Sequence, residues 1–150
     1  MKQQLVNSLI AGLFGLFALS GIAAELDFGD HSSETLTSKA WEALNAGKQD
    51  QALAFADKCI ELHGKEAVKM QKKLTDFADD SEASKYWALN DVGTCYFIKG
   101  KALEKQGKKK EAAAALTYLK DNLGYSQCWD PNGWFWHPAE AAAELIAELK

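Results

Sequence analysis

The chain has 150 residues, with 17 Lys+Arg against 21 Asp+Glu, 47% hydrophobic residues and three Cys. This length fits one domain with a single core and is short for two. All of the cations are lysines, and the formal net charge is −4. An acidic chain without arginine is a poor candidate for binding nucleic acid, so we expect no nucleic-acid partner.

The first 24 residues have the order of a secretory signal peptide. A positive start at Lys2 precedes an apolar run from Leu9 to Leu19, and Ile22 and Ala24 supply the small or apolar residues of a cleavage site. The run is shorter than the about 20 apolar residues of a membrane span. We therefore expect cleavage after Ala24, a periplasmic or secreted protein, and no membrane association once the signal is removed.

Beyond residue 32 the apolar spacing is helical almost throughout, and strand alternation is absent. Ser32 and Ser33 are candidate N-caps, Gly64 is a candidate stop, and Pro138 suits the first position of the last helix. A short extension, residues 25–32, precedes this region. The sequence predicts one all-α domain over residues 33–150 with about six helices, at 34–46, 50–63, 65–78, 82–106, 110–122 and 138–149.

Two segments of the chain place large and small residues at identical intervals. The first segment contains Leu36, Ala40, Ala43, Gly47, Ala52, Ala56 and Cys59. The second contains Tyr96, Gly100, Leu103, Gly107, Ala112, Leu116 and Leu119. Small residues allow the two helices of a hairpin to approach closely, and a glycine can close the turn between them.

This pattern resembles the tetratricopeptide repeat over residues 33 to 122, although Leu36 and Tyr96 stand where that family has a large Trp. The resemblance implies a short stack of antiparallel helical hairpins, because one hairpin cannot bury its own apolar face. It also implies a peptide-binding groove lined by the first helix of each hairpin, at Thr37, Trp41, Asn45, Phe97, Lys101 and Lys105. A lysine there would pair a peptide carboxylate. The alternative is that Trp41 and Phe97 only pack beneath the third helix.

The tail from Tyr125 to Pro138 is rich in Trp and contains the type I turn sequence Asp130-Pro131-Asn132-Gly133. The turn would bring Trp129 beside Trp134. One interpretation is a loop that, with a C-terminal capping helix, covers the open end of the stack, since buried aromatics are the commoner case. The alternative is a glycan platform formed by Trp129, Trp134 and Trp136. The tail also resembles that of small secreted chains labelled glucanase precursors, which implies no mechanism.

Three cysteines allow at most one internal disulfide. If a disulfide forms, we expect it to join Cys95 and Cys128, because Cys128 lies in a loop that can move to meet a helix. We expect Cys59 to be buried. The histidines lack the spacing of a metal site. No carboxylate pair or Ser/His/Asp set stands out.

The leading hypothesis is a non-catalytic helical-repeat module of the bacterial envelope that binds a protein or peptide, without cofactor or metal. The alternative is a secreted glycan-binding or glycan-hydrolysing protein that uses the Trp-rich tail. A homodimer is a further alternative, because short stacks often cover an open face with a second copy.

Overall fold

The computed structural model describes residues 25–149, and these are mostly helical. In chain order the elements are α1 (Ser33–Asn45), α2 (Gln49–Gln71), the 3₁₀ turn η1 (Ala83–Tyr86), α3 (Trp87–Lys105), α4 (Lys109–Asn122), β1 (Cys128–Asp130), β2 (Trp134–Trp136) and α5 (Pro138–Glu148). The all-α character is confirmed, with a small two-stranded sheet in addition. The expected signal peptide lies outside the described residues. None of the helices described is long and apolar enough to span a membrane.

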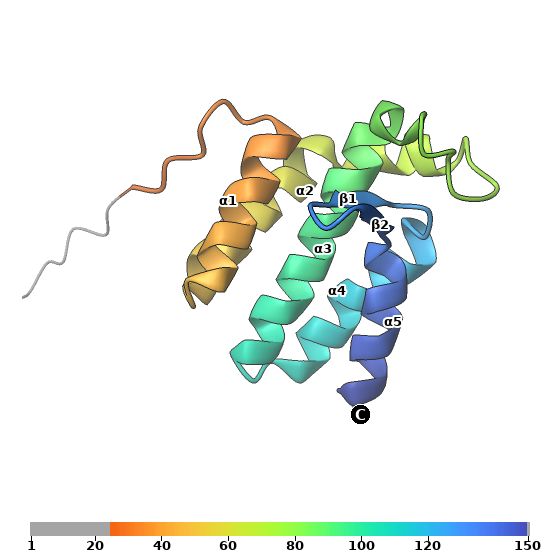
Figure 1. Ribbon diagram of the computed structural model, residues 1–150. Coiled ribbons are helices and arrows are strands. Elements are labelled where there is room, and N and C mark those ends of the chain that lie inside the picture. Colours follow the sequence, from red (N-terminus) through yellow and green to blue (C-terminus); the bar gives the residue numbers. More distant parts are fainter. Residues whose placement is uncertain (1–24, 150) are drawn as a thin grey trace, which may run out of the picture.

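The helix α3 lies at the centre of the bundle (Figure 1). It packs against α1, α2, α4 and α5, and the hairpin of β1 and β2 lies across it. Ser32 caps α1 as predicted, since its side chain accepts a hydrogen bond from the Thr35 N–H. Pro138 begins α5 as predicted, and α5 packs against α4.

The prediction of about six helices is wrong, because the second predicted segment and the first half of the third form one helix, and residues 72–78 are not helical. α2 passes through Gly64 and continues to Gln71. A glycine inside a helix costs about 1 kcal/mol relative to alanine. Beyond it, Ala67 and Met70 are buried in the core, and their burial offsets this cost. Farther along the chain, the start of the predicted fourth helix forms η1, and the α-helix begins only at Trp87.

The turns that close the two hairpins, α1–α2 and α3–α4, have the same geometry. Gly47 and Gly107 both have a positive φ, 71° and 75°. After the first glycine, the Lys48 N–H donates to the Ala43 carbonyl at 2.8 Å, and the equivalent bond after Gly107 measures 2.9 Å. This is the Schellman ending of a helix, which a left-handed glycine permits. The matched intervals in the sequence therefore fall on equivalent turns.

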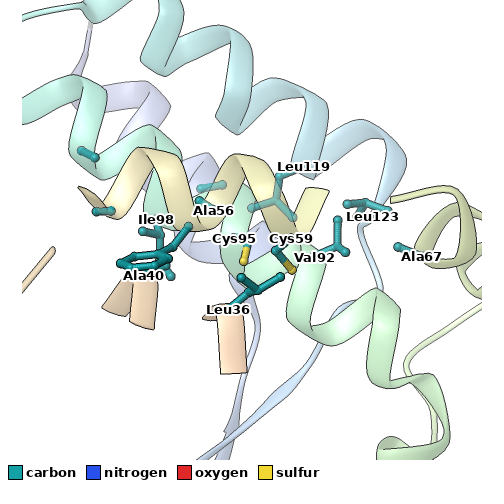
Figure 2. Packing of buried hydrophobic residues seen from close by; sticks show 14 of the residues in the cluster. Leu36, Ala40, Ala56, Cys59, Ala67, Val92, Cys95, Ile98, Leu119 and Leu123 are labelled. Atoms are coloured by element: carbon teal, nitrogen blue, oxygen red, sulfur yellow. The ribbon is translucent and has the colours of Figure 1, made fainter. Parts of the chain in front are cut away.

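Small residues lie where the helices of each hairpin pack together. A Cβ atom at Gly100 would lie 2.5 Å from Leu116 Cγ, so α3 and α4 could not pack this closely with a larger residue there. At the equivalent positions of the first hairpin, Ala40 and Ala56 are both fully buried. Figure 2 shows these alanines in the core together with Ile98 of α3.

We expect Gly64→Ala to raise the free energy of unfolding by about 1 kcal/mol. The new methyl group would meet only Ile60 Cγ2, at 3.9 Å. Gly100→Ala is the matched control and should lower the free energy of unfolding by about 1–3 kcal/mol, because its methyl group would overlap Leu116. Urea denaturation followed by circular dichroism measures both values. A loss of stability in Gly64→Ala, or a gain of stability in Gly100→Ala, would contradict the packing described here.

Candidate ligand-binding cleft

The tail forms a β-hairpin whose turn is the predicted Asp130–Gly133 segment. The Gly133 N–H donates to the Asp130 carbonyl at 2.9 Å, and the Asp130 side chain accepts from the Asn132 N–H at 2.8 Å. In the antiparallel register Trp129 pairs with Phe135, and Asp130 pairs with Trp134. Trp129 therefore packs on Phe135, with ring centroids 5.2 Å apart, and not on Trp134 as the sequence suggested.

Trp136 of β2 packs with one aromatic residue from each of two helices. Its ring centroid lies 6.1 Å from that of Trp41 on α1 and 5.0 Å from that of Phe97 on α3. Trp41 and Phe97 are themselves 6.1 Å apart. We refer to Trp41, Phe97 and Trp136 as the aromatic cluster. These contacts differ from the expected packing of Trp41 and Phe97 beneath the third predicted helix, because both rings pack against Trp136 of the tail.

The aromatic cluster lines a cleft of about 810 Å³ between α1, α3 and the hairpin. Four of the six predicted groove residues line the cleft. Two of these four, Trp41 and Phe97, belong to the aromatic cluster. The lining further includes Thr37, Asn45, Asp91, Thr94, Trp129 and Asp130. Residues expected in two separate sites, a peptide groove and a glycan platform, therefore meet in one cleft.

The remaining two predicted groove residues lie outside this cleft. Lys101 pairs with Glu104 on its own helix, with 3.4 Å between Nζ and Oε2. Lys105 borders a separate shallow hollow beside the Gly47 turn. The hairpin contacts α3 nearer its N-terminus, through Thr94 and Phe97, so the two lysines lie beyond the covered part of the helix. The charged residues that do line the cleft are carboxylates, and they favour a cationic ligand group over a carboxylate.

Asp91 is a partly buried carboxylate of this cleft that the sequence analysis missed. Burial raises its pKa, and the Ser33 hydroxyl, which donates to Asp91 Oδ2, partly opposes that effect. The sequence did carry a signal, because Asp91 is the only charged residue between Lys85 and Lys99. An isolated charge in an otherwise uncharged helical segment is costly to bury and frequently marks a functional position.

The three tryptophans of the tail do not form a single surface. Trp136 is partly buried and packs in the aromatic cluster. Trp129 and Trp134 remain 62% and 53% exposed. Trp136 therefore packs against α1 and α3, whereas the indoles of Trp129 and Trp134 are accessible to a ligand.

The three cysteines are free thiols, and the predicted Cys95–Cys128 disulfide is not present. Cys95 faces Cys59, as Figure 2 shows, and Thr37 Oγ1 lies 3.2 Å from Cys95 Sγ and 3.9 Å from Cys59 Sγ. Cys128 Sγ instead contacts Thr94 Oγ1 at 2.9 Å. Neighbouring positions of a helix point in different directions, so Thr94 faces the hairpin while Cys95 faces the core.

Burial also determines the chemistry of these thiols. It raises the pKa of Cys95, and it raises the pKa of Cys128 to about 11. Both groups therefore stay protonated at neutral pH, and a protonated thiol is a poor nucleophile. Among residues 25–149, no group of three His, Cys, Asp or Glu residues is arranged to hold a metal ion.

Comparison with protein-family models, with curated proteins and with solved structures finds no match to this chain. The residues of the cleft and their chemistry are therefore the basis on which a function can be proposed.

We expect Asp91→Asn to gain stability relative to the unchanged chain as the pH rises above 3.8, the ordinary pKa of the carboxyl group. A raised folded-state pKa means that the folded chain binds the proton more tightly than the unfolded chain. The unchanged chain therefore loses stability from that pH up to the folded-state pKa. Asparagine carries no charge and still offers an oxygen to Ser33.

Urea denaturation of both chains at about pH 3, 5 and 7 measures this difference, because contributions from distant groups cancel between the variants. A difference that stays constant with pH, or that changes in the opposite direction, would show that burial of Asp91 does not raise its pKa.

Proposed function

We propose that this protein is a non-catalytic binding module that holds a short peptide segment in the cleft between α1, α3 and the hairpin. The observation that carries the proposal is the meeting of four predicted groove residues with the tryptophans of the hairpin in one cleft. Its volume of about 810 Å³ lies within the roughly 300–1,000 Å³ of typical ligand sites.

The lining of the cleft suits a peptide better than a purely apolar ligand. The aromatic cluster provides a surface for an apolar side chain. Asn45, exposed at one edge, offers an amide to the peptide backbone. Asp91 and Asp130 add negative charge, which favours a peptide with a basic residue.

The tetratricopeptide-like pattern supports the same proposal. The first helix of each hairpin, α1 and α3, borders the cleft, as the ligand-facing helices of that family do. The β-hairpin also borders it, so a short extended segment suits the space. A periplasmic or secreted location is part of the proposal and depends on the predicted signal peptide.

Selection of a phage-displayed random peptide library on residues 25–150 tests the proposal. Enriched peptides should lose about 30-fold in affinity for Trp41→Ala/Phe97→Ala, because loss of central aromatic contacts costs about 2 kcal/mol or more of binding free energy. Tyr96→Ala/Tyr118→Ala is the control and should bind normally. It removes a stacked pair, with centroids 4.6 Å apart, that borders a different hollow.

Circular dichroism first establishes that both double variants fold. If no peptide is enriched, or if both variants lose affinity equally, the cleft is not a peptide-binding site.

Glycan binding is the second candidate function, favoured by the exposed indoles of Trp129 and Trp134. A flat apolar ring of this kind can stack on the C–H face of a sugar. Titration with β-glucan and peptidoglycan fragments, followed by Trp fluorescence and by release of reducing ends, separates binding from hydrolysis. We expect a glycan response to disappear in Trp129→Ala/Trp134→Ala and to persist in Trp41→Ala/Phe97→Ala. Absence of both signals would exclude this candidate.

A further inference from the structure

A second hollow, of about 590 Å³, lies on the other side of Trp129. Trp129 and Asp91 line both this hollow and the cleft. The hollow lies between the first turn of α1, η1, the start of α3 and the hairpin. It combines three aromatic residues with three carboxylates, and we call it the acidic hollow: Trp87, Trp129, Phe135, Glu34, Asp80 and Asp91.

The aromatic residues of the acidic hollow leave ring surface open to a ligand. Trp129 is 62% exposed and Trp87 is 46% exposed. Each indole makes a T-shaped contact with a neighbouring ring. The ring centroids of Trp129 and Phe135 are 5.2 Å apart, and those of Trp87 and His63 are 5.7 Å apart. The face of an indole ring carries partial negative charge and attracts a cation more strongly than other aromatic rings do.

The carboxylates give the acidic hollow a negative charge that its own lining does not neutralise. No Lys or His is among the residues that line it. Asp91 accepts a hydrogen bond from a neutral group, the Ser33 hydroxyl, and the nearby Glu34 adds like-charge repulsion. A cation in the acidic hollow would lie among exposed indole rings and carboxylates.

We propose that the acidic hollow binds the guanidinium group of an arginine side chain, presented by a peptide whose adjacent residues occupy the cleft. The peptide as the source of the arginine rests on the function proposed above, whereas the affinity of the hollow for guanidinium does not. Guanidinium is planar, so it can stack on an indole and donate paired hydrogen bonds to a carboxylate. The compact, strongly hydrated ammonium of lysine matches this site less well.

The probe for this inference is N-acetyl-arginine amide, titrated into residues 25–150 while the indole N–H signals are followed by NMR. Single Trp→Phe variants assign the five indole signals. We expect saturable shifts of the Trp87 and Trp129 signals with a dissociation constant of about 1–10 mM, as weak contacts of this kind give. The Trp134 signal, from a side chain outside both hollows, should not shift.

Two further probes test the charge and the shape of the ligand. The neutral analogue N-acetyl-citrulline amide should give no saturable shift, and N-acetyl-lysine amide should bind several-fold more weakly than the arginine probe. Equal binding of citrulline would overturn the role of charge. Equal or tighter binding of lysine would overturn the assignment to guanidinium.

Substitutions of the carboxylates test whether the probe binds in the acidic hollow. Asp91→Asn should weaken binding of the arginine probe about tenfold, and the exposed Glu34→Gln tests the same hollow without disturbing a buried group. Asp57→Asn is the control, because Asp57 pairs with Lys99 away from the hollow. Unchanged affinity in both Asp91→Asn and Glu34→Gln would overturn the inference. If the arginine probe binds but no peptide is enriched from the library, only the proposed peptide ligand is overturned, and the guanidinium site stands. The failure of one proposal can therefore be distinguished from the failure of the other.

Discussion

The close packing of α3 against its neighbours is the constraint on which the rest of the structure depends. Gly100 allows α4 to approach until Leu116 lies against the α3 backbone, and Gly93 does the same for the loop at Ser126, where a Cβ would lie 2.5 Å from the Ser126 hydroxyl. These contacts fix the rotation of α3 about its axis. Once that rotation is fixed, Asp91 and Phe97 face the cleft, because residues of one helix keep constant angles to one another.

A buried amide then fixes the hairpin to α3. The Gln127 N–H donates to the side-chain oxygen of Asn90 at 3.0 Å, and the Asn90 amide donates to the Ala83 carbonyl at 2.9 Å. The Gln127 side chain donates to the Ala78 carbonyl at 2.8 Å. A buried polar group without a partner is costly, so these bonds select one position for the hairpin. That position brings Trp136 into the aromatic cluster.

The result is a surface on which aromatic rings and carboxylates are shared between two hollows. Trp129 and Asp91 belong to both, so a ligand that occupies one hollow meets groups that also define the other. The thiols of Cys95 and Cys128 are protonated and contribute packing. The indoles of Trp87, Trp129 and Trp134 remain exposed to solvent. Such side chains suit the ligand binding that we propose.

The sequence by itself determined the features that depend on neighbours along the chain. Helical spacing, the Ser32 cap, the left-handed turn at Gly47 and the Asp130 turn follow from local backbone geometry and short-range hydrogen bonds, and each was predictable. Only the tertiary structure decided that α2 continues through Gly64, because distant packing offsets a local preference. It also decided that Cys95 meets Cys59, that Lys101 lies outside the cleft and that Asp91 lines it. These outcomes depend on which helix faces meet in space, and residue spacing does not specify that.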